Sequence, residues 1–175
     1  MTEICVAPYA TFEQSYRGLG YSVRPSTGKS CYEKGWNVSD DELPPGTYER
    51  WLKEMPKFNI GLRMGTEYPD GTRIGALDID HLNPKYVELG RLLLGNPVSG
   101  RVGSKGAVFF FRYPPLKFKH RKQILLNGKE LVADILLTGL VVIPPSIHPG
   151  TKKPYTWLGK PLHETHYSEL PFIGE

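Results

Sequence analysis

Apolar and polar residues alternate at the period of a β-strand along residues 73–81, where the sequence reads RIGALDIDH. This period places every second side chain on the same face of a strand. Residues 107–112 are apolar on both faces, which predicts a strand in the middle of a sheet. Shorter segments of similar character predict further strands, at residues 21–25, 59–65, 132–136 and 140–143.

Helices are predicted between these strands. Apolar spacing and capping residues predict helical segments over residues 12–19, 48–55 and 84–94. The last of these would turn one apolar side toward the core, formed by Val87, Leu89 and residues 92–94.

Turn residues at 68–71 and 138–139 predict two β-hairpins. The first would lead into the acidic strand at 73–81, and the second would join residues 132–136 to residues 140–143. Together the pattern predicts an α+β fold with a mixed or antiparallel sheet, acidic residues on one face of that sheet and helices packed behind it.

Composition narrows the class of protein. A chain of 175 residues with 39% hydrophobic residues is most simply one domain, residues 1–175, with a sizeable core. No apolar run resembles a signal peptide or a membrane span, so we expect a soluble cytoplasmic protein without a membrane partner. Cys5 and Cys31 are too few and too far apart for a disulfide scaffold or a thiolate zinc site. The net charge of +4 gives a slight preference for an anionic partner.

Three aspartates are the strongest candidates for chemistry. Asp78 and Asp80 lie two residues apart on the predicted strand and therefore share a face. Two like charges so close call for a cation, and oxygen ligands suit Mg²⁺ or Mn²⁺. Asp134 lies in an otherwise apolar segment, which makes it the natural third ligand. The alternative is that the pair caps a turn and faces water, and that Asp134 is hydrogen-bonded to a neighbour.

A glycine-rich basic loop precedes the apolar strand, at residues 99–106. It offers Arg101, Ser104 and Lys105, and its glycines let backbone N–H groups approach a phosphate closely. His148 lies in the proline-fixed segment 144–149, which would hold the imidazole rigidly for binding. A plain connecting loop and a purely structural turn are the respective alternatives.

Other basic residues are candidates for phosphate contacts. Lys29 follows a loop that resembles a phosphate-binding P-loop, but Val23 stands where that motif requires glycine, so only the lysine is retained as a possible contact. A second cluster could contact a nucleic-acid backbone, or could simply form a solvated surface; it consists of Lys117, Lys119, Arg121 and Lys122.

Several of these motifs, taken in chain order, resemble the primase-polymerase domain of phage and plasmid replication proteins, in the archaeo-eukaryotic primase superfamily. The most specific are the hydrophobic Asp-x-Asp and the block PPSIHP with the Tyr-x-Trp that follows it. The motifs are LDID at 77–80, GSKG at 103–106, FFR at 110–112, Asp134, PPSIHP at 144–149 and YTW at 155–157.

The resemblance implies template-directed nucleotidyl transfer, making primers from NTPs or extending them with dNTPs on a DNA template. It implies that Asp78, Asp80 and Asp134 are catalytic acids that bind Mg²⁺ or Mn²⁺, and that Ser104, Lys105 and His148 contact the nucleotide. A fused or separate helicase and a helical primase domain are possible partners, the chain could be the N-terminal part of a longer replication protein, and a phage or plasmid origin would place it in the cytoplasm of a bacterial host.

Two departures from the family pattern stand out. Many members have a histidine just after the glycine loop, where this chain has Lys105, and relatives often have polar residues where this chain has the apolar residues 140–142. Two other functions fit the residues. One is a metal-dependent nuclease or phosphodiesterase, in which the same acids activate water. The other is a nucleic-acid-binding module that has lost catalysis.

Overall fold

The structure is a computed structural model that describes residues 7–115 and 122–174. The helices of this part are α1 (Pro8–Gly18), α2 (Thr47–Glu54) and α3 (Pro84–Leu93), with short 3-10 turns η1 (Asp40–Glu42), η2 (Leu162–Glu164) and η3 (Tyr167–Glu169). Its strands are β1 (Val23–Ser26), β2 (Asn59–Arg63), β3 (Arg73–Ile79), β4 (Ser99–Val102), β5 (Ala107–Tyr113), β6 (Lys122–Leu126), β7 (Glu130–Leu136), β8 (Leu140–Ile143) and β9 (Thr156–Gly159).

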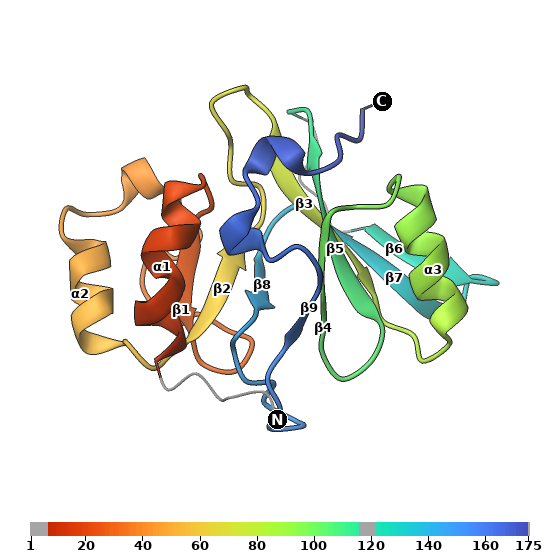
Figure 1. Ribbon diagram of the computed structural model, residues 1–175, viewed down its shortest axis with the longest axis horizontal. Coiled ribbons are helices and arrows are strands. Elements are labelled where there is room, and N and C mark those ends of the chain that lie inside the picture. Colours follow the sequence, from red (N-terminus) through yellow and green to blue (C-terminus); the bar gives the residue numbers. More distant parts are fainter. Residues whose placement is uncertain (1–6, 116–121, 175) are drawn as a thin grey trace.

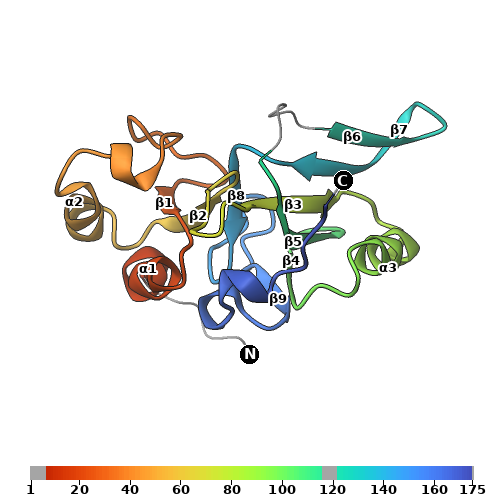
Figure 2. The ribbon, with the colours of Figure 1, turned by 90° about the horizontal axis from the view of Figure 1, so that it is seen from above.

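These strands form two sheets that lie side by side (Figures 1 and 2). The small sheet has the order β1-β2-β8 and the large sheet has the order β6-β7-β3-β5-β4-β9, and all their strand pairs are antiparallel. Helices α1 and α2 lie beside the small sheet, and α3 packs on β3 and β5 of the large one. The predicted α+β fold is confirmed, as is the interior position of β5.

The chain crosses between the sheets three times, after β2, after β7 and after β8. Both predicted hairpins are therefore wrong, because the strands on either side of residues 68–71 and of residues 138–139 belong to different sheets. The first turn does form, with the Tyr68 amide donating to the Thr72 carbonyl at 2.8 Å. The crossovers after β2 and β7 touch, since a Cβ added to Gly65 would lie 2.7 Å from the Leu137 carbonyl oxygen.

One core joins the two sheets. Ile60 and Leu62 of β2, Ala76 of β3 and Phe110 of β5 are buried together with aromatic residues of α1 and α2. Alternation along β3 then sends Leu77 and Ile79 to the opposite face of the large sheet, where a smaller core lies under α3. Because Asp78 alternates with Leu77 and Ile79, helix α3 lies behind the acidic face, as the sequence predicts.

Helix α3 buries only part of the side that the sequence predicts, since Val87 packs against the smaller core and Leu94, just after the helix, is buried in it. Its closest approach to β3 is at Gly90, where an added Cβ would lie 2.8 Å from the Ile79 side chain. The packed side of α3 therefore contains Tyr86, Val87 and Gly90. Leu89, Leu92 and Leu93 are 51%, 54% and 67% exposed, because they point away from this glycine contact.

Candidate active site

Two of the three acids and one arginine form a single row across the large sheet. Asp78 of β3 stands directly opposite Asp134 of β7 on one side and Val108 of β5 on the other. Val108 in turn stands opposite Arg101 of β4. Directly opposed residues of antiparallel strands point to the same face, so all four side chains share one face of the sheet. Two strand spacings separate Arg101 from Asp78, about 10 Å at the backbone, which a long side chain can bridge.

Asp78 and Asp134 place two carboxylates beside each other in a poorly solvated setting. Asp134 is 2% exposed and Asp78 is largely buried. Burial raises the pKa of Asp78, and the charges of Asp80 and Asp134 raise it further, whereas Arg101 and Lys29 oppose the rise. A carboxylate in such surroundings is stabilised by added positive charge, which is the electrostatic condition for binding a cation.

Asp80 lies just beyond the end of β3 and contacts the glycine-rich loop. Its Oδ1 lies 3.1 Å from Nζ of Lys105, so the lysine ammonium supplies the neighbouring positive charge. The loop reaches this position because Gly106 packs against the end of β3 with φ of 58°. A Cβ on Gly106 would lie only 1.7 Å from the Ile79 carbonyl oxygen, so any side chain there would displace the loop.

Arg101 is largely buried and stacks its guanidinium on the ring of Tyr155, 4.6 Å from the ring centroid. Burial lowers the pKa of Arg101, and the charge of Asp78 opposes that change. Nε of Arg101 and the hydroxyl of Tyr155 are buried without a hydrogen-bond partner among residues 7–115 and 122–174. Buried polar atoms in this state are expected to bind a ligand or ordered water.

His148 is held in one protonation form by the turn that follows β8. Its Nδ1 accepts hydrogen bonds from the backbone amides of Gly150 and Thr151, both at 3.1 Å. A neutral imidazole whose Nδ1 accepts must carry its proton on Nε2, which leaves an N–H donor for the pocket. Burial lowers the pKa of His148, and Lys29 and Arg101 add to this effect.

Asn59 joins the His148 turn to the turn that carries Lys29. Its Nδ2 donates to the Gly28 carbonyl at 3.2 Å and to the Ile147 carbonyl at 2.9 Å, and its Oδ1 accepts from the Ile147 amide at 2.9 Å. Lys29 itself lies exposed at the rim. Sequence reasoning missed the roles of Asn59 and Tyr155, since their contacts depend on segments far away in the chain.

The acidic and basic side chains described above, with His148 and Tyr155 but without Asn59, line one pocket of about 240 Å³. It brings together the three predicted acids and all five predicted nucleotide contacts; its lining is Lys29, Asp78, Asp80, Arg101, Gly103, Ser104, Lys105, Asp134, His148 and Tyr155. Lys122 is exposed on β6 and does not line this pocket. The predicted basic residues Lys117, Lys119 and Arg121 lie outside the described residues.

The donor set of the pocket fits a hard divalent cation such as Mg²⁺ or Mn²⁺, because carboxylate oxygens are the ligands such ions prefer. Across the described ranges, no three His, Cys, Asp or Glu side chains are gathered closely enough to form a ready metal-binding group. The ion pair with Lys105 holds Asp80 in its present position, so Asp80 would have to turn from Lys105 toward Asp78 to share an ion with it.

Comparison with known proteins identifies the family of the chain. In the parts of the chain that the structure describes, no helix is long and apolar enough to cross a membrane. No curated protein matches the sequence closely enough to be counted as a relative. A sequence model of the bifunctional DNA primase/polymerase N-terminal domain matches residues 13–172, nearly the whole chain. The chain therefore belongs to the bifunctional DNA primase/polymerase family, and its function is of the primase and polymerase type in DNA replication.

Proposed function

We propose that the pocket joins nucleotides on a DNA template by two-metal phosphoryl transfer, in the replication of a phage or plasmid. The observation that supports this most strongly is the row of Asp134, Asp78 and Arg101 across one sheet face. Acidic and basic groups in one pocket match a substrate that is itself a polyanion and arrives with divalent cations.

The acids would hold Mg²⁺ or Mn²⁺ through Asp78, Asp80 and Asp134. Such ions neutralise the triphosphate and make a primer hydroxyl a better nucleophile. In the reaction, a bond forms between the 3′-oxygen of the primer and the α-phosphorus, the bond from that phosphorus to the leaving pyrophosphate breaks, and the proton of the 3′-hydroxyl passes to solvent. The chain's own contribution is to align the two reactants and to compensate their charge.

The basic side chains would bind the triphosphate. Arg101 has an unused buried Nε, and its stacking on Tyr155 fixes the plane of the guanidinium. Lys105 would exchange Asp80 for a phosphate oxygen when the metal binds, and Lys29 would approach from the opposite rim. The Nε2–H of His148 would donate to a phosphate oxygen without adding charge, and Ser104 lies exposed on the same loop.

Primer extension tests this proposal directly. Purified protein is incubated with a primed DNA template, Mg²⁺ or Mn²⁺, and labelled NTPs or dNTPs. We expect the isosteric variants Asp78→Asn, Asp80→Asn and Asp134→Asn each to lose about a thousandfold in rate, as several kcal/mol of transition-state stabilisation are removed. Glu88→Gln on α3 is the control, because it removes one exposed carboxylate far from the pocket.

Other outcomes would identify other functions. Shortening of the primer that depends on the same acids would show a nuclease or phosphodiesterase. DNA binding that persists without metal and is unchanged by Asp78→Asn, with no extension by the wild-type protein, would show a binding module. Omitting the primer would establish whether the protein starts chains, and adding a helicase or a helical domain would test those partners.

A further inference from the structure

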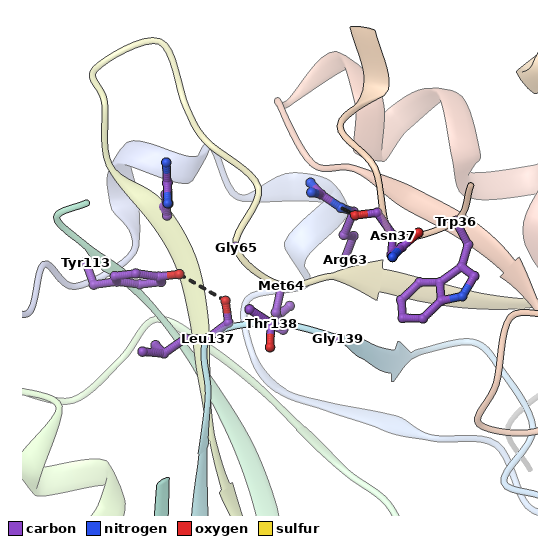
Figure 3. A pocket seen from close by; sticks show the side chains of 10 residues that line it. Trp36, Asn37, Arg63, Met64, Gly65, Tyr113, Leu137, Thr138 and Gly139 are labelled. Atoms are coloured by element: carbon purple, nitrogen blue, oxygen red, sulfur yellow. Dashed lines mark hydrogen bonds between the residues drawn. The ribbon is translucent and has the colours of Figure 1, made fainter. Parts of the chain in front are cut away.

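A second cavity, of about 260 Å³, lies where the chain crosses between the two sheets. Figure 3 shows its two sides. Trp36, Asn37 and Arg63 lie on one side, and Tyr113 and Leu137 lie on the other, joined by a 3.0 Å hydrogen bond from the tyrosine hydroxyl to the Leu137 carbonyl. The cavity lies where the crossovers after β2 and β7 leave the sheets, at residues 64–65 and 137–139.

Arg63 gives this cavity an excess positive charge. Within the described residues it makes no ion pair; its Nε donates to the Asn37 carbonyl at 3.2 Å and one terminal nitrogen donates to Oγ1 of Thr66 at 3.4 Å. The charges of the three acids of η1 act on Arg63, but these acids have other partners: Asp40 pairs with Arg24 at 2.9 Å, and Asp41 and Glu42 are hydrogen-bonded to Ser39. Burial and the charge of Arg24 lower the pKa of Arg63, whereas Asp40 and Glu42 oppose the change.

Arg73 also lines the cavity, and its charge is balanced at present. Its Nε and one terminal nitrogen donate to Oε2 of Glu67 at 3.1 and 2.7 Å. Glu67 is exposed and lies outside the lining, so it is a neighbour of the cavity and not part of its wall. The lining itself therefore has two guanidinium groups and no carboxylate.

The remaining lining suits one unpaired nucleotide. The indole of Trp36 offers a flat surface for a base, and every base stacks on aromatic rings irrespective of its sequence. Asn37 and Thr138 also line the cavity, are exposed, and carry donors and acceptors for a base edge. A recess of this size holds a single base and its phosphate, and a base pair within a duplex could not turn into it.

The cavity opens on the same side of the small sheet as the active site. Ile60 and Leu62 of β2 point into the core, so Asn59 and Arg63 share the opposite face of that strand. Asn59 holds the turns of Lys29 and His148, and Arg63 lies four residues further along, about 13 Å away.

From these observations we propose that the cavity binds one nucleotide of a single-stranded DNA template, with its phosphate on Arg63 and its base on Trp36. The identity of the strand as template rests on the proposed function, whereas the nucleotide chemistry rests on the cavity alone. A strand bound there would continue along β2 toward the acidic row.

Equilibrium binding of a fluorescein-labelled oligothymidylate, measured without divalent metal at several salt concentrations, tests the proposal. We expect Arg63→Gln to weaken binding about tenfold or more, through the loss of a charge-assisted hydrogen bond. The slope of log affinity against log salt should shrink by about 0.7, the value for one phosphate contact on a single strand. Arg91→Gln removes an exposed arginine on α3 and should change neither quantity.

Two further variants keep the test decisive if Arg63→Gln folds poorly. Glu67→Gln releases Arg73 from its ion pair, so it should tighten binding and increase the slope by about 0.7. Trp36→Leu should weaken binding about fivefold or more with an unchanged slope, because stacking is uncharged. Equal affinity and slope in Arg63→Gln, Glu67→Gln and wild type would overturn the proposal.

A competition arm distinguishes a strand from a free nucleotide. If Arg63→Gln weakens binding of free dTTP and leaves the oligonucleotide unaffected, the cavity holds a mononucleotide and the template assignment is wrong.

Primer extension separates this inference from the proposed function. Arg63→Gln should raise the template KM and keep the maximal rate, whereas Asp78→Asn loses the rate. If Arg63→Gln weakens oligonucleotide binding but the wild-type protein extends no primer, the proposed function is refuted and nucleotide binding by the cavity still stands.

Discussion

Asn59 stabilises the site without lining its pocket, because its amide fixes the turns of Lys29 and His148 relative to each other. We expect Asn59→Ala to cost about 3 kcal/mol of unfolding free energy, roughly 1 for each of three hydrogen bonds. The nucleotide KM should rise more than kcat falls. The reason is that Lys29 and His148 would lose their alignment, whereas Asp78 and Asp134 on the large sheet would keep theirs. Urea denaturation and steady-state extension kinetics measure the two effects.

The exposed Asn96, with φ of 59°, provides the matched control. Asn96→Ala should cost about 1–2 kcal/mol through backbone strain and leave the nucleotide KM unchanged. An equal rise in KM for both variants would mean that Asn59 acts through general stability and not through the two turns.

For single residues of the pocket, the sequence predicted those that stand out from their immediate neighbours in the chain. Asp78 and Asp80 share a face through simple alternation, and Asp134 stands out as a charge among apolar neighbours. Tyr155 was singled out only as part of the Tyr-x-Trp motif of the family resemblance, and nothing local in the sequence predicts its contact with Arg101. Its ring meets Arg101 only because β9 pairs with β4 in a register that brings segments about fifty residues apart together, and hydrophobic pattern does not specify that register.

At the scale of elements, two glycines in left-handed turns differ in their surroundings. Gly106 and Gly128 have φ of 58° and 69°, but an added Cβ meets the Ile79 backbone at Gly106 and nothing within 4 Å at Gly128. Gly128→Ala should therefore cost about 1–2 kcal/mol from strain alone. Gly106→Ala should cost about 3 kcal/mol or more, and it should also raise the nucleotide KM because the loop of Ser104 and Lys105 must move.

Paired urea denaturation curves and KM values for the two glycine variants test this difference. Similar losses of stability with no change in KM would show that the glycine-rich loop adapts without disturbing the site, and that Gly106 is required only for its backbone angle.

Whether a segment is a helix or a strand was easier to predict than which strand it pairs with or which of its sides is buried. The strands at 73–79 and 107–113 and all three helices were anticipated, because periodicity is a local property. The two hairpins failed because turn residues specify a reversal of the chain and not the strand that will pair afterwards. The packed side of α3 was predicted only in part, at Val87 and Leu94, because Gly90, the smallest residue on the helix, determines the closest approach to β3.

At the scale of the whole molecule, the site needs both sheets. The acids and Arg101 belong to the large sheet, whereas Lys29 and His148 lie on turns that follow strands of the small one. The larger core passes between the sheets and contains buried residues from both, with Phe110 of β5 fully buried in it. A shared core implies that the sheets unfold together, and that site geometry is lost in the same transition.

Unfolding followed at two tryptophans tests this coupling. Trp51 of α2 lies beside the small sheet and Trp157 of β9 belongs to the large one, and both contact the shared core. Proteins that retain only one of these reporters should show the same urea midpoint. Phe110→Ala should lower the unfolding free energy seen by both reporters by the same amount, about 3–5 kcal/mol, since it opens a cavity between the sheets. Two separate midpoints, with Phe110→Ala shifting only the Trp157 transition, would mean that the sheets are independent units and that the pocket can be lost while the small sheet stays folded.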